Sequence, residues 1–152
     1  MSKGHGMKTL NKSRKENGPG GVKEMTAKRL KQLKIDGRIL WYTRLNAGNP
    51  TKRMKLCDAG TFDFEFITFR WLEAVTVFLE IKREGHGVTF NDLDYEQRIF
   101  AAQFSTYKNV ACAVINHEDQ LILLLDHIKG EEKQFKNFKG DYRIVSGKGG
   151  SK

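Results

Sequence analysis

The sequence predicts an α/β domain, or an α+β variant of it, with a small mixed β-sheet flanked by helices. In residues 62–82, two runs rich in β-branched and aromatic residues flank a short turn at 70–73, which is typical of a β-hairpin. The residue patterns predict a helix and a strand before this hairpin, and a helix and a strand after it. A chain of 152 residues is long enough to form one such domain with a buried core.

The first helix is expected at residues 22–34, because apolar residues recur there at helical spacing and basic residues cover the rest of the surface. The apolar stripe consists of Val22, Met25, Leu30 and Leu33. Gly37 is the expected stop. Residues 39–45 then predict a strand, which the turn-forming sequence at 46–50 ends.

The second strand of the hairpin is apolar on both faces until its last turn, so we expect it in the centre of the sheet. At its exit, Glu80 and Lys82 point to the same side, about 7 Å apart along the strand. Asp63 lies near the start of the partner strand, so two carboxylates and an amine can converge at this end. Buried charges are costly unless they pair or bind a metal. A salt bridge and a divalent-metal site both stay open here.

A second helix is expected at about residues 92–107, with Asn91 or Asp92 as its cap. Gln97 falls on the apolar face of this helix. Because a buried amide needs hydrogen-bonding partners, Gln97 either ties down a backbone group or reaches into the site at the end of the hairpin.

Two elements are expected in the last part of the chain. Residues 110–115 predict a buried strand. The apolar run at 120–128 has no clear period and is compatible with either a strand or a helix. From Lys129 onward the composition is polar and basic again.

The charge of the chain is strongly positive and unevenly distributed. The formal net charge is +9, and the first 34 residues hold ten Lys or Arg against two acidic residues. A polyanion such as DNA or RNA is the natural partner for this surplus, and a solvated, solubilising tail is the alternative. A second basic patch at 52–55 fits phosphate contact or ordinary loop solvation equally well.

Several classes of protein are disfavoured by what the sequence lacks. It has no apolar run near the roughly 20 residues that span a bilayer, so no membrane association is expected. Its basic, polar start lacks the apolar stretch of a signal peptide, and Cys57 and Cys112 cannot form a disulfide framework or a four-ligand zinc site, so a reducing cytoplasm is the expected compartment. There is no Gly-x-Ser-x-Gly, Walker or dinucleotide motif.

The chemistry that remains is the pattern of Asp63 followed, after sixteen residues, by Glu80-Ile81-Lys82. Mg²⁺ prefers about six oxygen ligands and keeps several waters, and Mn²⁺ is the alternative ion. Two carboxylates and the backbone carbonyl of Ile81 could supply the protein share. The ion would lower the pKa of a bound water and neutralise charge on a scissile phosphate, while Lys82 would position the water and stabilise developing charge.

This pattern resembles the PD-(D/E)XK nuclease superfamily. A wider series of segments is similar to the VRR-NUC domain in order: Trp41-Tyr-Thr-Arg44-Leu-Asn46-Ala-Gly48, Gly60-Thr-Phe-Asp63, Phe78-Leu-Glu80-Ile-Lys82, and a helix with Gln97. The resemblance covers residues 22–128 and implies a restriction-endonuclease-like core. It leaves residues 1–21 as a flexible basic arm and residues 129–152 as a basic C-terminal tail.

The resemblance implies roles for individual residues. Asp63 and Glu80 look like the metal carboxylates, Lys82 like the catalytic lysine, and Gln97 like the glutamine that supports the site. Related enzymes place a Glu of the first helix near the metal, which makes Glu24 a candidate. The position of Glu24 opposite the apolar stripe favours a surface pair with Lys28 instead. The usual proline before the Asp is replaced by Phe62, which affects turn stiffness more than chemistry.

The resemblance further implies a metal-dependent DNA endonuclease of phage or bacterial DNA processing. It would be selective for branched or junction DNA and act as a homodimer, or a higher homo-oligomer, whose two-fold axis matches that of the DNA. The expected DNA contacts are Lys28, Lys31, Arg44, Asn46, Lys52, Arg53 and Lys55. Two alternatives stay open: a non-catalytic nucleic-acid-binding protein in which Asp, Glu and Lys form an ion-pair cluster, and a sequence-specific restriction-type nuclease.

Overall fold

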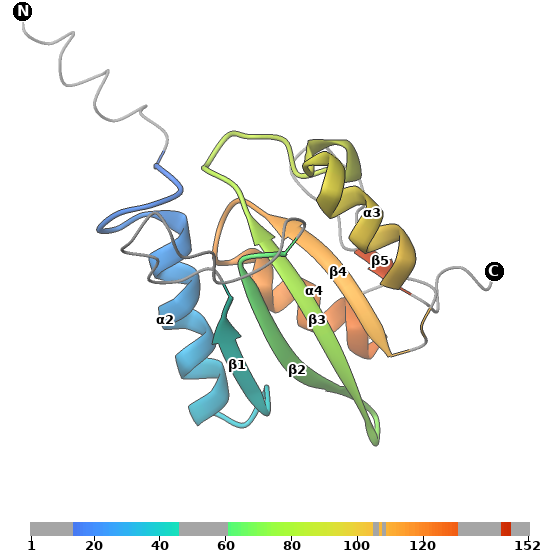
Figure 1. Ribbon diagram of the computed structural model, residues 1–152. Helices are drawn as coiled ribbons and strands as arrows, with labels where there is room; N and C mark the ends of the chain where they lie inside the picture. Colours follow the sequence, from blue (N-terminus) through green and yellow to red (C-terminus); the bar gives the residue numbers. More distant parts are fainter. Residues whose placement is uncertain (1–13, 46–60, 105–106, 108, 131–143, 147–152) are drawn as a thin grey trace, which may run out of the picture.

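The computed structural model describes residues 14–45, 61–104, 107, 109–130 and 144–146. Within these residues it has three α-helices, one short 3₁₀ turn and five strands that form a single sheet (Figure 1). Along the chain, the elements are α2 (Val22–Ile35), β1 (Trp41–Arg44), β2 (Phe64–Arg70), β3 (Glu73–Ile81), η1 (Phe90–Asp92), α3 (Tyr95–Phe104), β4 (Val110–Ile115), α4 (Gln120–Lys129) and β5 (Ile144–Ser146).

The sheet is mixed, as the sequence predicts, and its strand order is β1-β2-β3-β4-β5. Strands β3 and β4 are parallel, whereas the other neighbouring pairs are antiparallel. The predicted hairpin is confirmed as β2 and β3, which Trp71 and Leu72 connect. The predicted central position of β3 is confirmed as well. The coarse class, α/β with a small mixed sheet, is therefore correct.

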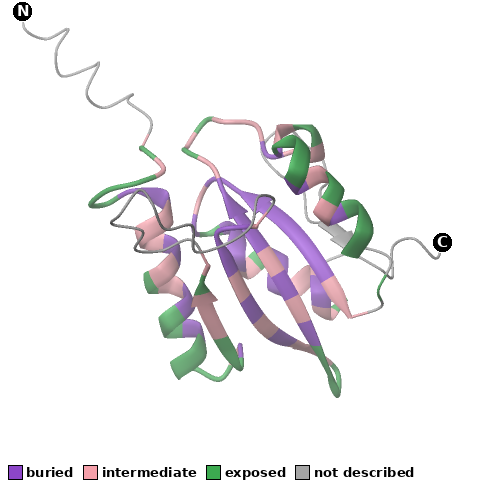
Figure 2. Cartoon of the chain, in the orientation of Figure 1, coloured by how far each residue is buried: buried purple, intermediate pink, exposed green. Residues whose placement is uncertain are grey.

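The two faces of the sheet carry separate hydrophobic cores. On one face, α2 and α4 pack against the alternate residues Val75, Val77, Leu79 and Ile81 of β3. On the other face, the smaller core around Phe62, Cys112 and Val114 includes Phe78 and residues of α3. Figure 1 shows α4 and α3 on opposite sides of the sheet, and Figure 2 shows β4 buried over nearly its whole length. Because Glu80 is in step with Phe78, its side chain belongs to the α3 face.

The helix expected at 92–107 begins later and ends earlier than predicted. Thr89 and Asp92 bond reciprocally and close the turn η1, with the backbone N of Thr89 donating to Asp92 Oδ2 at 2.8 Å. Asp92 therefore caps this turn rather than the helix, and α3 begins at Tyr95. Its buried residues include Ala101 and Gln97.

The ambiguous run at 120–128 is helix α4. Its buried apolar residues are Leu121, Leu124, Leu125 and Ile128, which follow the helical spacing of three and four. Leu123 in the middle of the run is 44% exposed, and this exposed leucine hides the period in the sequence. Gly130, at φ +90°, ends the helix in the left-handed conformation that glycine accepts without strain.

Parts of both expected tails belong to the domain. In the segment expected to be a flexible arm, residues 14–21 contact the body through Arg14, which pairs with Glu84 and Glu118. In the segment expected to be a C-terminal tail, Ile144–Ser146 forms β5 and pairs with β4. No helix among the described residues has the length and apolar character needed to cross a bilayer.

Candidate active site

The site lies where β3 ends and β2 begins. The last pair of the hairpin is Phe64 with Leu79, so one further step in register brings Asp63 opposite Glu80. The backbone N of Asp63 donates to the carbonyl of Leu79 at 3.1 Å, which continues the ladder by one bond. The two carboxylates predicted from the sequence to converge are therefore direct cross-strand neighbours.

Asp63 is held at both of its oxygens and is only 6% exposed. Its Oδ2 accepts a hydrogen bond from the backbone N of Ile81 at 2.9 Å. Its Oδ1 lies 3.0 Å from the Nζ of Lys23. The backbone at Ile81, whose carbonyl is the expected third ligand, is thus fixed against Asp63.

Glu80 is 8% exposed and lies in an unfavourable place for a negative charge. Burial, and then the neighbouring carboxylate of Asp63, raise the pKa of Glu80 to about 8, although Lys82 and Gln97 act in the opposite direction. The Nζ of Lys82 lies 3.7 Å from Glu80 Oε2, which is too long for a strong hydrogen bond. The surroundings of Glu80 therefore favour its protonated form over the carboxylate.

Gln97 both ties down backbone groups and reaches into the site, which the sequence left open as alternatives. Its Nε2 donates to Glu80 Oε1 at 2.8 Å and, at 3.4 Å, to the carbonyl of Thr61. Its Oε1 accepts from the backbone N of Asp94 at 3.1 Å, at the start of α3. Because the amide oxygen is occupied by this helix start, the NH₂ group has to face Glu80. Helix α3 thus positions Glu80 through Gln97.

Sequence reasoning missed Lys23. It counted only as part of the basic surface of the first helix, yet its Nζ contacts Asp63 and lies 3.2 Å from Glu16 Oε2. Burial alone would lower the pKa of Lys23, but the two carboxylates raise it above its ordinary value. A lysine in the first turn of a helix, where the helix dipole disfavours a cation, is the signal that could have pointed to it.

Glu24 differs from both of its predicted roles. Its Oε1 accepts a hydrogen bond from the backbone N of Gly20 at 2.6 Å, so it closes the loop before the helix. It is the neighbouring Lys23, and not Glu24, that the helix brings to Asp63.

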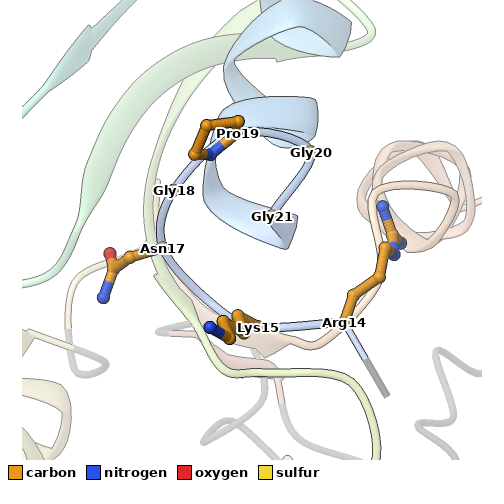
Figure 3. Close-up of a pocket in the computed structure, with 7 residues that line it drawn as sticks. All are labelled: Arg14, Lys15, Asn17, Gly18, Pro19, Gly20 and Gly21. Carbon is orange, nitrogen blue, oxygen red and sulfur yellow. The ribbon is translucent and has the colours of Figure 1, made fainter. Parts of the chain in front are cut away.

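The loop at residues 14–21 places both Glu16 and Lys23. The backbone N of Val22 donates to the carbonyl of Lys15, and the backbone N of Lys23 donates to that of Glu16, each at 2.9 Å. These bonds satisfy amides that a helix start leaves open. Figure 3 shows the loop curling around a hollow, with the side chain of Arg14 pointing away from the ring. The loop therefore acts as a backbone cap that holds Glu16 beside Lys23.

A second charged cluster lies close by, and we call Arg14, Glu84 and Glu118 the anchor cluster. Arg14 lies 3.3 Å from Glu84 Oε2 and 2.8 Å from Glu118 Oε1. Hydrogen bonds from Arg14, first of all from its backbone N, lower the pKa of Glu84. Burial alone would raise the pKa of Glu118, yet the guanidinium brings it below its usual value. Arg14 thus favours the charged form of both carboxyl groups.

The expected DNA contacts are only partly within the described residues. Lys28 and Lys31 lie on the exposed surface of α2, and Arg44 lies at the end of the edge strand β1, 5.8 Å above the ring of Phe64. Asn46, Lys52, Arg53 and Lys55 lie outside the described residues, as does Cys57. Cys112 is buried and free.

The residues present fit a hard divalent ion with few protein ligands. The described residues contain no group of three or more His, Cys, Asp or Glu side chains that could hold a metal. Mg²⁺ commonly takes one or two carboxylates from a protein and keeps water for its remaining positions. Asp63 and Glu80 are two such carboxyl groups, and a divalent cation between them would offset the repulsion that contributes to the raised pKa of Glu80.

Comparison of the chain with protein-family models, curated proteins and solved structures gives no match. The function is therefore inferred from the geometry at Asp63 and Glu80 together with the pattern of the sequence.

Proposed function

We propose that this protein is a metal-dependent DNA endonuclease of the PD-(D/E)XK type, with a restriction-endonuclease-like core similar to the VRR-NUC domain. The observation that carries the proposal is the meeting of two buried carboxylates beside a lysine. Asp63 and Glu80 adjoin across the hairpin, and Lys82 lies 3.7 Å from Glu80. Two buried carboxylates that lie so close that one raises the pKa of the other are typical of a functional site.

Asp63, Glu80 and the carbonyl of Ile81 would hold Mg²⁺ or Mn²⁺. When bound, the ion supplies a nucleophile from water at neutral pH and neutralises charge on the phosphate. Two contacts from the chain keep the carboxylates in place: the backbone N of Ile81 on Asp63 and the amide of Gln97 on Glu80. A cation held here would favour the ionised form of Glu80, because it would offset the repulsion between the two carboxylates.

Lys82 is the group of this chain that would act on the reacting atoms. It follows the last residue of β3, and its backbone N donates to the carbonyl of Ile115 at 2.8 Å, which fixes the start of its side chain. A side-chain ammonium next to Glu80 can orient the attacking water and stabilise negative charge that develops on the phosphate. Its Nζ lies 3.7 Å from Glu80 Oε2.

DNA would be held through its phosphates rather than read by its bases. The net charge of +9, concentrated in the first 34 residues, suits sequence-independent binding to a polyanion. Lys28 and Lys31 are exposed on α2, whose N-terminal end carries Lys23 into the site. Phosphate contacts set register without sequence information, so we propose selection by DNA shape, for branched or junction DNA and by a homodimer.

The test is a cleavage assay with Mg²⁺ or Mn²⁺ on a panel of junction, flap, nicked, single-stranded and linear duplex DNA. We expect cutting that depends on the metal and is strongest on branched substrates. Discrete fragments from plasmid DNA would indicate a sequence-specific nuclease instead. No metal-dependent cutting of any substrate would contradict the proposal.

A second candidate is a non-catalytic nucleic-acid-binding protein, which one observation favours. Lys23 and Lys82 already lie against Asp63 and Glu80, as they would in a structural ion-pair cluster. Calorimetry with Mn²⁺ separates the two functions. The nuclease predicts binding that Asp63→Asn removes, and the structural cluster predicts no such binding.

A further inference from the structure

The position of Lys23 lowers the stability of the helix to which it belongs. It is the second residue of α2, where the positive end of the helix dipole disfavours a cation. Its side chain is only 14% exposed, so it also gives up most of its hydration. Despite these two unfavourable contributions to stability, Lys23 is placed here, and its Nζ lies 3.0 Å from Asp63 Oδ1. The placement of this lysine thus serves the site and not the helix.

The ammonium of Lys23 is shared between two unequal carboxylates. Asp63 is almost enclosed, with a side chain 8% exposed, whereas the side chain of Glu16 is 33% exposed. Glu16 is also tied to Lys23 through the backbone, since its carbonyl accepts from the backbone N of Lys23. If Asp63 is taken by another cation, the ammonium still has a partner at 3.2 Å.

We propose that Lys23 is a tethered cation that competes with the divalent metal for Asp63, and that Glu16 is the partner to which it retreats when the metal binds. This inference rests on the proposed function, because it needs a metal at Asp63. Each oxygen of Asp63 already has one partner, the Ile81 backbone on Oδ2 and Lys23 on Oδ1, so an incoming ion would meet the positive charge of the ammonium at 3.0 Å from Oδ1. Lys23 is a positioning residue that sets the metal concentration at which the site loads.

The first arm of the experiment measures Mn²⁺ binding to the full chain by calorimetry, without DNA. Lys23→Met removes the competing charge at nearly constant volume, and we expect the metal to bind about tenfold more tightly. Lys15→Met is the matched control, because it removes an equal charge from an exposed side chain of the loop that precedes α2. We expect its affinity to stay close to that of the unaltered chain. An equal gain in both variants would overturn the proposal, since it would reflect net charge alone.

The second arm uses Glu16→Gln, for which we expect the opposite sign. Without Glu16 the ammonium depends on Asp63 alone, so Mn²⁺ should bind several-fold more weakly. In the Lys23→Met background the same change should have almost no effect, because Glu16 acts through Lys23. An equal loss of Mn²⁺ affinity in both backgrounds would identify Glu16 as a direct metal ligand. It would overturn the role of Glu16 as the second partner of the Lys23 ammonium.

Asp63→Asn separates this inference from the proposed function. If the unaltered chain shows no Mn²⁺ binding that Asp63→Asn removes, the metal site itself is wrong. If that binding is present and Lys23→Met leaves it unchanged or weaker, only the role of Lys23 is overturned. Should Lys23→Met fail to fold, Glu16→Gln still tests the proposal, because its one-third-exposed side chain can be exchanged at little cost, and an unchanged affinity would overturn the proposal.

Discussion

Two clusters of carboxylates and cations follow the ends of the parallel strands β3 and β4, and they differ in how their charges are arranged. In the anchor cluster, Arg14 binds Glu84 and Glu118 and lowers the pKa of both, that of Glu84 first of all through its backbone N and that of Glu118 through its guanidinium. At the candidate active site, Asp63 faces Glu80 directly, and the pKa of Glu80 rises to about 8. In the anchor cluster, the cation favours the charged form of both carboxyl groups. At the candidate active site, the two carboxyl groups disfavour each other's charge, and a divalent cation between them would offset this repulsion.

The largest expected effect is the loss of cleavage on removal of Glu80 or Lys82. Glu80→Ala or Lys82→Ala should reduce the rate of metal-dependent DNA cutting by about 10³-fold, because each removes charge stabilisation that acts in the transition state. DNA affinity, measured by fluorescence anisotropy, should hardly change. Glu84→Ala in the anchor cluster is the control and should retain most of the activity. Full cutting by either site variant would contradict the assignment.

Gln97 is expected to matter less, because it touches Glu80 and not the substrate. Gln97→Ala should lower kcat/KM for cleavage about 10- to 100-fold, the range typical of residues that hold a metal ligand in place. Gln120 is the matched control, since its Oε1 accepts from the backbone N of Asn116 at 2.9 Å and so holds a backbone group rather than Glu80. Gln120→Ala should lower thermal stability with little effect on kcat/KM. Equal effects of the two variants on kcat/KM would show that Gln97 is only structural.

The raised pKa of Glu80 predicts how the stability of the metal-free protein depends on pH. A carboxyl whose folded pKa of about 8 exceeds its ordinary 4.5 contributes stability below 4.5, and that stability is lost as the pH rises toward 8. The free energy of unfolding should therefore fall across this window, by at most about 1.4 kcal/mol per pH unit. Urea unfolding in EDTA measures it. Glu80→Gln should flatten the decline, and an unchanged slope would contradict the burial argument.

The anchor cluster predicts a smaller effect with the opposite sign. Because the pKa values of Glu84 and Glu118 are lowered, their contribution is present above the ordinary value of 4.5 and is lost as the pH falls below it. Hydrogen exchange should show the backbone N–H of Arg14 losing protection at acidic pH, while β3 stays protected. In Arg14→Ala, the backbone amides of residues 14–21 should lack protection from hydrogen exchange even at neutral pH. Protection that persists in this variant would mean that the loop is held by its backbone bonds alone.

Local patterns in the sequence were sufficient to predict the centre of the site. Alternation along a strand has a period of two, so Glu80 and Lys82 had to share a side, and the hairpin had to bring Asp63 near them. The position of Gln97 on an apolar helix face likewise required a buried partner for its amide, and that partner is Glu80. Each of these inferences needs only neighbours in sequence or one tight turn.

Contacts between distant segments could be identified only from the tertiary structure. Lys23 reaches Asp63 from a helix 40 residues earlier, and Arg14 reaches Glu118 across 104 residues. Helix α4 could be assigned only once the sheet showed which leucines it covers, and β5 only once β4 offered it an edge. A sequence pattern shows which face of an element is buried, but not which other element covers it, because that depends on the path of the whole chain. The sequence by itself therefore determined the two carboxylates and their lysine, and the tertiary structure decided which further charges surround them.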